Sequence, residues 1–142
     1  MTDTVKLLQE CNTGIKMGKE ALRIVMPHVC SDKLRAILRL SESTHAALGD
    51  EIRLRLIELC ANTNDPHPII QRLSSAKICV SLLVCDSDKR IASIMTDGCD
   101  MGIKSIYKYL NKYKNASEEA IDLAKRIVAS EDCLERELRH FL

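Results

Sequence analysis

Apolar residues recur at alternating spacings of three and four along four long segments, the pattern of an α-helix with one buried face. The first segment runs from about residue 4 to residue 26, and Pro27 ends it because the residue before proline is disfavoured in the helical region. The second begins near Ser31 or Asp32, either of which suits an N-cap, and ends in the turn-forming run 61–66. The inward positions of the first segment are Leu8, Cys11, Ile15, Gly18, Leu22 and Val25.

The other three inward faces follow from the same spacing. A third long helix is expected to begin at the N-cap candidates of 86–88 and to run to about Lys112, and a capping-box pattern at 115–118 opens the fourth. The second face consists of Leu34, Leu38, Ser41, His45, Leu48, Ile52, Arg55 and Leu59. The third consists of Ile91, Ile94, Gly98, Met101, Ser105 and Tyr109. The fourth consists of Ala120, Leu123, Ile127, Ser130, Leu134, Leu138 and Phe141.

The lengths of the connections predict the topology. Short turns join the first two helices and the last two, so each pair is antiparallel. The middle connection, residues 62–86, has about 25 residues and contains an apolar helical segment, which is long enough to cross the whole bundle. We therefore predict an all-α, single domain over residues 1–142: a ferritin-like four-helix bundle with a long helical crossover between its second and third helices. A plain five-helix bundle is the alternative.

Composition supports a helical protein and excludes several classes. The chain has 142 residues with 21 Lys+Arg against 20 Asp+Glu, so it lacks the strong positive charge of proteins that coat nucleic acid or anionic membranes. Five Gly and three Pro are too few for the frequent turns of an all-β chain. No signal-peptide pattern and no apolar run of ~18 residues is present, so we expect a cytoplasmic protein without a membrane segment.

Seven cysteines, an odd number, occur without any C-x-x-C pair. This usage favours a reducing compartment over a disulfide framework or a zinc ribbon. We expect these cysteines to be small buried side chains. An exposed cysteine beside a cation would instead favour a thiol-based sensor.

Two segments resemble a known family. Residues 8–21 contain a glycine, an aliphatic residue and a basic or small stretch that leads to Glu20 and Ala21. Residues 97–110 place an acidic residue before small residues and then a tyrosine. Both segments resemble an uncharacterised bacterial family of ferritin-like four-helix-bundle proteins, whose layout spore-coat-like ferritin relatives share. The resemblance implies a fold and no established activity, and residues 69–85 lack the tryptophan of that family.

A ferritin-like fold suggests a two-metal carboxylate site, which uses one Glu from each of two helices and a Glu-x-x-His from each of the other two. One such motif is present, Glu42 to His45. Counting from the turns brings Asp97 level with Glu131 or Asp132, but Leu134 stands where a second histidine is needed. Glu42, His45, Asp97 and Glu131 are thus weak candidate ligands for iron, manganese or another divalent metal. The competing interpretation is that His45 is a core histidine hydrogen-bonded to a neighbour.

We expect the glycines within helices, and the lysines near the end of the third helix, to have structural roles. Gly14, Gly18, Gly98 and Gly102 lie within helices, where we expect them to permit close approach of a neighbouring helix. The lysines near the end of the third helix complement its dipole; they are Lys104, Lys108, Lys112 and Lys114.

Apolar residues outside a single inward face predict a second contact surface. They are Leu54, Leu56, Ile57, Val80, Leu82 and Leu83, which the crossover and a homodimer would cover. The sequence therefore predicts a non-enzymatic structural or interaction protein that self-associates and contacts neither nucleic acid nor membrane. We expect no catalytic residue and no cofactor. The alternative is a metal-binding ferritin-like protein with a degenerate carboxylate–histidine site.

Overall fold

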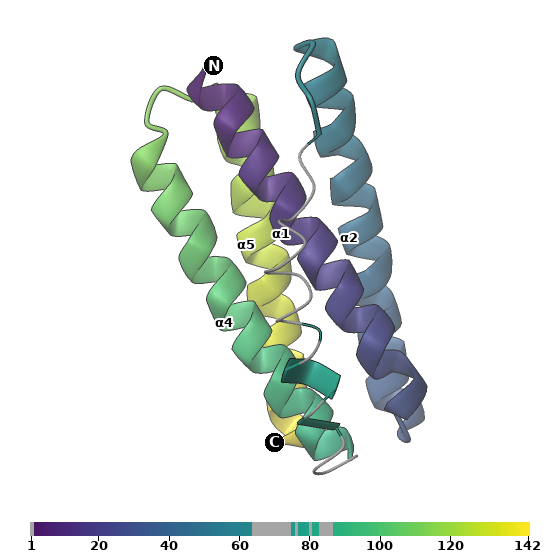
Figure 1. Ribbon diagram of the computed structural model, residues 1–142. Coiled ribbons are helices and arrows are strands. Elements are labelled where there is room, and N and C mark those ends of the chain that lie inside the picture. Colours follow the sequence, from purple (N-terminus) through teal and green to yellow (C-terminus); the bar gives the residue numbers. More distant parts are fainter. Residues whose placement is uncertain (1, 64–74, 76, 80, 83–86) are drawn as a thin grey trace.

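The computed structural model describes residues 2–63, 75, 77–79, 81, 82 and 87–142. These residues form four long helices that lie side by side (Figure 1) and two short 3₁₀ turns, with no strand among them. The all-helical prediction is confirmed. The long helices are α1 (Asp3–Val25), α2 (Asp32–Glu58), α4 (Asp88–Lys112) and α5 (Glu118–Leu138), and the turns are Met26–His28 and Arg139–Phe141.

Each long helix begins at a hydroxyl N-cap followed by an acidic first turn. The hydroxyl accepts a hydrogen bond from a backbone N–H that has no partner within the helix, and loss of such a cap typically costs ~1 kcal/mol. These caps explain why the helices begin where the sequence predicted. The hydrogen bonds are Val5 N to Thr2 (3.2 Å), Leu34 N to Ser31 (3.3 Å), Arg90 N to Ser87 (3.1 Å) and Ala120 N to Ser117 (3.2 Å).

Two sets of side-chain-to-backbone hydrogen bonds show in which direction the helices run. At one end of the bundle, the carboxylate of Asp88 accepts the backbone N–H groups of Cys30 and Ser31, both at 2.8 Å. Because Asp88 opens α4 and Ser31 caps α2, these two helices start at the same end.

At the opposite end, the N-terminal residues of α1 hold the loop that precedes α5. Asp3 accepts the N–H of Asn115 at 3.0 Å, and the Thr4 hydroxyl accepts the N–H of Ser117 at 2.8 Å. Helices α1 and α5 therefore run parallel to each other and antiparallel to α2 and α4 (Figure 1).

The four helices form a ring in which α1 contacts α2, α2 contacts α5, α5 contacts α4 and α4 contacts α1. Helices α1 and α5 also meet across the centre. The end of α2 and the start of α4 lie at opposite ends of the bundle, as the predicted crossover requires. Most of the predicted crossover, 62–86, lies outside the described residues; within it, Lys77–Cys79 is helical and Leu82 is buried. None of the helices in the described ranges offers an apolar stretch of the length that a bilayer demands.

The core divides into two apolar clusters. The upper cluster, at the start of α1, contains Val5, Leu7, Leu8, Cys11, Ile15, Leu48, Ile52, Leu56, Ile106, Tyr113, Ala120, Leu123, Ala124, Ile127 and Val128. The lower cluster contains Leu22, Val25, Val29, Leu34, Leu38, Leu82, Ile91, Met95, Cys99, Leu134 and Leu138. On every helix a few residues lie at the boundary between the two clusters, and some of these, together with Cys99 of the lower cluster, form the candidate site described below.

The predicted inward face of α4 is wrong by about one position. Gly98, Met101 and Ser105 are exposed. Ile91 is buried as predicted, and the rest of the buried face consists of Ala92, Met95, Thr96, Cys99 and Ile106. This shift buries the apolar Ile106 in place of Ser105, which accounts for the preference. A smaller error occurs at the end of α2, where Leu59 is exposed and Leu56 is buried.

The prediction that the cysteines are buried is also largely wrong. Cys11 and Cys99 are buried, whereas Cys85 lies outside the described residues. Burial raises the pKa of the Cys11 thiol to about 12, so it stays protonated and unreactive at neutral pH. The exposed cysteines lie at helix ends or on outer faces: they are Cys30, Cys60, Cys79 and Cys133.

Candidate functional site

A histidine occupies the boundary between the two apolar clusters. His45 lies on the inner face of α2 and is only 3% exposed. Its Nδ1 is 2.8 Å from the carbonyl oxygen of Ser41, one turn earlier, and 3.3 Å from the Ser41 hydroxyl. Because a carbonyl oxygen only accepts hydrogen bonds, Nδ1 carries a proton and donates it to Ser41. The prediction that His45 faces inward is confirmed.

The other ring nitrogen reaches across to α5. His45 Nε2 is 2.9 Å from Oε1 of Glu131, and the two side chains are 4% and 13% exposed. Burial lowers the pKa of His45, but the hydrogen bond with Glu131 and the charge of that carboxylate outweigh it, so the net pKa is raised above 6.5. With Nδ1 already protonated, a carboxylate at Glu131 requires a second proton on Nε2. Below the raised pKa of His45 the contact is therefore an imidazolium–carboxylate pair. The positive charge of Lys19 on α1 makes the smallest contribution and lowers the pKa of His45.

Helix α1 approaches the ring so closely that only glycine fits. A Cβ at Gly18 would lie 2.9 Å from His45 Nε2 and 3.0 Å from Cδ2. The close approach expected for Gly18 is confirmed. At Gly14 and Gly98 a Cβ would meet nothing within 4 Å, so the same expectation is wrong there; at Gly102 it would lie 3.9 Å from Glu131, an ordinary contact.

Helix α4 contributes a thiol to the same layer. Burial, followed by the charge of Glu131 and a hydrogen bond with that carboxylate, raises the pKa of Cys99 far above its usual range. We call this set the polar layer: Gly18, Ser41, His45, Cys99 and Glu131, with at least one member from each long helix. Every buried side-chain nitrogen or oxygen in the described residues has a hydrogen-bond partner.

The four predicted metal ligands are divided by the structure. It brings His45 and Glu131 together, but Glu42 and Asp97 are exposed on outer faces. The residue that contacts His45 within its own helix is Ser41, four positions earlier, rather than Glu42, three positions earlier. Among the described residues, no group of three or more His, Cys, Asp or Glu side chains is placed to hold a metal ion.

The sequence contained signals for part of this layer. Gly18, Ser41 and His45 all interrupt predicted apolar faces near their midpoints. If these three residues are placed at the same height along the bundle, the sequence predicts a polar layer there. Cys99 was missed because the inward face of α4 was predicted one position away.

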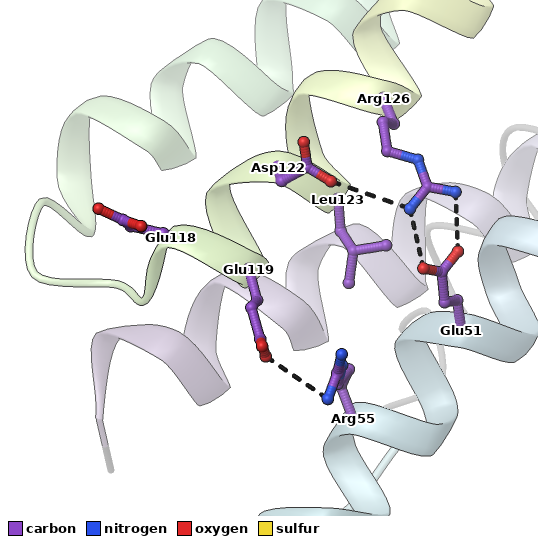
Figure 2. Close-up of a pocket in the computed structure, with 7 residues that line it drawn as sticks. All are labelled: Glu51, Arg55, Glu118, Glu119, Asp122, Leu123 and Arg126. Carbon is purple, nitrogen blue, oxygen red and sulfur yellow. Dashed lines mark hydrogen bonds and ion pairs between the residues drawn. The ribbon is translucent and has the colours of Figure 1, made fainter.

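A second link between α2 and α5 lies at the surface. A hollow of about 280 Å³ is lined by Glu51, Arg55, Glu118, Glu119, Asp122, Leu123 and Arg126. Figure 2 shows that Arg126 and Arg55 point toward carboxylates, whereas Glu118 points away. Arg126 donates two hydrogen bonds of 2.8 Å to Glu51, and Arg55 lies 3.5 Å from Glu119.

These ion pairs keep the side chains that form them in their charged states. The hydrogen bond from Arg126 is the main cause of a lowered pKa at Glu51, and the same contact raises the pKa of Arg126. Both arginines already have carboxylate partners. The hollow is therefore an exposed ion-pair network between two helices.

A solved structure with a similar arrangement is the crystal structure of a DUF305 fragment from Deinococcus radiodurans. The two structures superpose with a TM-score of 0.76 over 99% of this chain and 95% of that one, at 11% sequence identity. This chain shares that fold. The identity is too low to transfer more than the fold. No family model matches the sequence, and no curated protein is a significant relative.

Proposed function

We propose that this chain is a non-enzymatic helical-bundle protein that acts through protein contacts, including self-association as a homodimer. The observation that carries the proposal is on the outer face of α2. Leu40, Leu54 and Ile57 are 66%, 60% and 65% exposed there. Large apolar side chains in one exposed row are typical of protein contact surfaces.

The polar layer supports this proposal because its contacts are explained by holding the helices together. Ser41 and Glu131 together use both ring nitrogens of His45. The polar layer thus holds α2, α4 and α5 in one register against α1. Its role in our proposal is to position the outer faces and not to bind a substrate.

We also propose a ferritin-like arrangement of the helices, a cytoplasmic location and a protein partner. The parallel course of α2 and α4 supports a ferritin-like arrangement of the bundle helices, of the kind found in the bacterial family that the sequence resembles. The exposed free cysteines support a cytoplasmic location, where thiols stay reduced. The near-neutral net charge of +1 supports a partner that is neither nucleic acid nor an anionic membrane.

Sedimentation velocity across a wide range of protein concentrations tests self-association. We expect the 16.0 kDa chain to convert from monomer to dimer as its concentration rises. A single monomeric species at every concentration would contradict the proposal.

A second candidate function is metal binding, and one observation favours it. Histidines that bind metals commonly donate their other ring N–H to a backbone carbonyl, as His45 does to Ser41. Its Nε2 and the Glu131 carboxylate would then be adjacent ligands, once the proton on Nε2 is released. Imidazole and carboxylate together suit iron, manganese or zinc.

Elemental analysis distinguishes the two candidates. The protein is purified after growth with iron, manganese and zinc, beside His45→Ala and the exposed control Glu42→Ala. Near-stoichiometric metal that is lost in His45→Ala and retained in Glu42→Ala would establish the metal site. No metal in any of the three supports the structural role of the polar layer.

A further inference from the structure

The outer face of α2 carries a second, regular seam. Its members are spaced four and three residues apart, and all are exposed: Ala36, Leu40, Ser43, Ala47, Asp50, Leu54 and Ile57. We call them the outer seam. It lies on the side of α2 opposite His45 and the buried residues. A 3.5-residue repeat is the pattern by which one helix packs along another at about 20°.

We propose that a second copy of this chain packs its α2 antiparallel to the first along the outer seam. This inference rests on the proposed self-association and specifies the face and the orientation. In this register, Leu40 lies level with Ile57 of the second copy, and Ser43 with Leu54 of the second copy. The small Ser43 therefore meets the large Leu54, and Leu40 and Ile57 form a pair of large apolar side chains near each end of the contact.

Charge distinguishes the two orientations. In a parallel pair, each residue of the seam faces its own counterpart, so the two Asp50 carboxylates would approach each other inside the contact. In the antiparallel register, Asp50 lies level with Ala47 of the second copy. Like charges that are brought together and partly desolvated are unfavourable, so the antiparallel pair is preferred.

The flanking charges are also self-complementary in the antiparallel register. Arg39 is exposed and makes no ion pair with the part of the chain that the structure describes. It lies level with Glu58 of the second copy, a carboxylate whose neighbour within the chain is Arg55 at 3.1 Å. The two-fold symmetry of the pair repeats this match at the other end.

The size of the seam predicts a weak dimer. At about 1.5 Å per residue, the distance from Ala36 to Ile57 is ~32 Å, and a helix presents a strip ~10 Å wide. Such a strip is smaller than the ~800 Å² that each partner buries in an ordinary stable interface. We therefore expect a reversible dimer that dissociates on dilution, rather than a permanent one.

The first test compares Leu54→Glu with Met101→Glu by sedimentation velocity. Leu54, which is 60% exposed, lies in the outer seam, whereas Met101, which is 66% exposed, is an apolar residue on α4. We expect Leu54→Glu to raise the concentration at which dimers form by roughly tenfold or more, and Met101→Glu to leave it unchanged. Circular dichroism and thermal unfolding of both variants check that each of them folds.

The outcomes separate this inference from the function on which it rests. A wild-type chain that stays monomeric overturns both. A wild-type dimer that neither substitution weakens leaves the proposed function standing and overturns the outer seam as its interface. A dimer weakened equally by both substitutions also overturns the seam, because nonspecific charge repulsion then explains the loss.

The second test is orientation, measured by disulfide cross-linking. Serine replaces every cysteine except the buried Cys11 and Cys99, and Leu40→Cys or Ile57→Cys is then added. We expect a cross-linked dimer when the two variants are mixed and none with either alone, because a disulfide needs Cα atoms within ~7 Å. Cross-linking of each variant with itself would show a parallel pair and overturn the proposal, as would no cross-link in a mixture that sediments as a dimer.

Discussion

Two ion pairs join α2 to α5 at nearly the same distance in very different surroundings. His45 and Glu131 are 2.9 Å apart, with side chains 4% and 13% exposed. Glu51 and Arg126 are 2.8 Å apart, with side chains 45% and 47% exposed. The comparison shows that distance alone does not measure what a contact contributes.

Water explains the difference. When one partner of the surface pair is removed, water and salt solvate the charge that remains. In the polar layer, the remaining group stays between two apolar clusters and loses the full value of its hydrogen bond.

The largest loss should follow Glu131→Leu. This change leaves His45 Nε2 without a partner in the core, so the free energy of unfolding should fall by about 3 kcal/mol. Urea or guanidinium unfolding measures it. A loss below ~1 kcal/mol would show that the layer is solvated and that the contrast with the surface pair is wrong.

The double substitution His45→Leu with Glu131→Leu is the matched control. It removes both polar groups, so no buried group is left unpaired. Well-packed apolar replacements of buried ion pairs are often neutral or stabilising. We therefore expect the double variant to be more stable than Glu131→Leu alone.

Gly18→Ala should produce the next largest loss. Its new Cβ would lie 2.9 Å from a ring that is held at both nitrogens, so the ring or α1 must shift, at a cost of ~1–3 kcal/mol. Gly14→Ala on the same helix meets nothing within 4 Å and should stabilise the protein by ~0.5–1 kcal/mol. Thermal unfolding of the pair tests both signs, and equal effects would contradict close packing at Gly18.

Stability should depend on pH through His45. Its folded pKa is raised above 6.5, mainly because the contact with Glu131 outweighs burial, so folding favours the protonated ring. This contribution is fully present below about pH 6.5 and is lost as the pH rises through the folded pKa. The Tm of the wild type relative to that of the double Leu variant should therefore fall as the pH is raised above 6.5, whichever of the two is the more stable at pH 6.5. A relative Tm that rises over that range would contradict the imidazolium assignment.

Arg126→Ala should have the smallest effect. The free energy of unfolding should change by less than ~1 kcal/mol, and the change should shrink further in high salt. Unfolding at low and high ionic strength measures both. A salt-independent loss as large as that of Glu131→Leu would show that the surface hollow is effectively buried.

The sequence predicted the helices and most of their inward faces well. Hydroxyl caps such as Ser31 and Ser117 act locally, and the spacing of apolar residues on α2 and α5 has one dominant phase. Helix α4 has two competing phases, because Ile94 and Met101 suggest one face while Met95 and Ile106 suggest the next. Only its contacts with α5 and α1 decide between them.

The site was harder to predict because it depends on the register between helices. His45 and Glu131 were named as candidates for the same cluster, and they do meet. Their remaining neighbours depend on how far each turn advances the next helix, which decides that His45 packs on Gly18.

The polar layer joins the helices of the bundle, and we propose that the outer face of α2 carries the association. Sedimentation velocity of the His45→Leu, Glu131→Leu double variant tests it most directly. We predict that the variant forms dimers over the same range of concentrations as the wild-type chain. A folded double variant that remains monomeric where the wild type is dimeric would contradict this account and place the function in the interior.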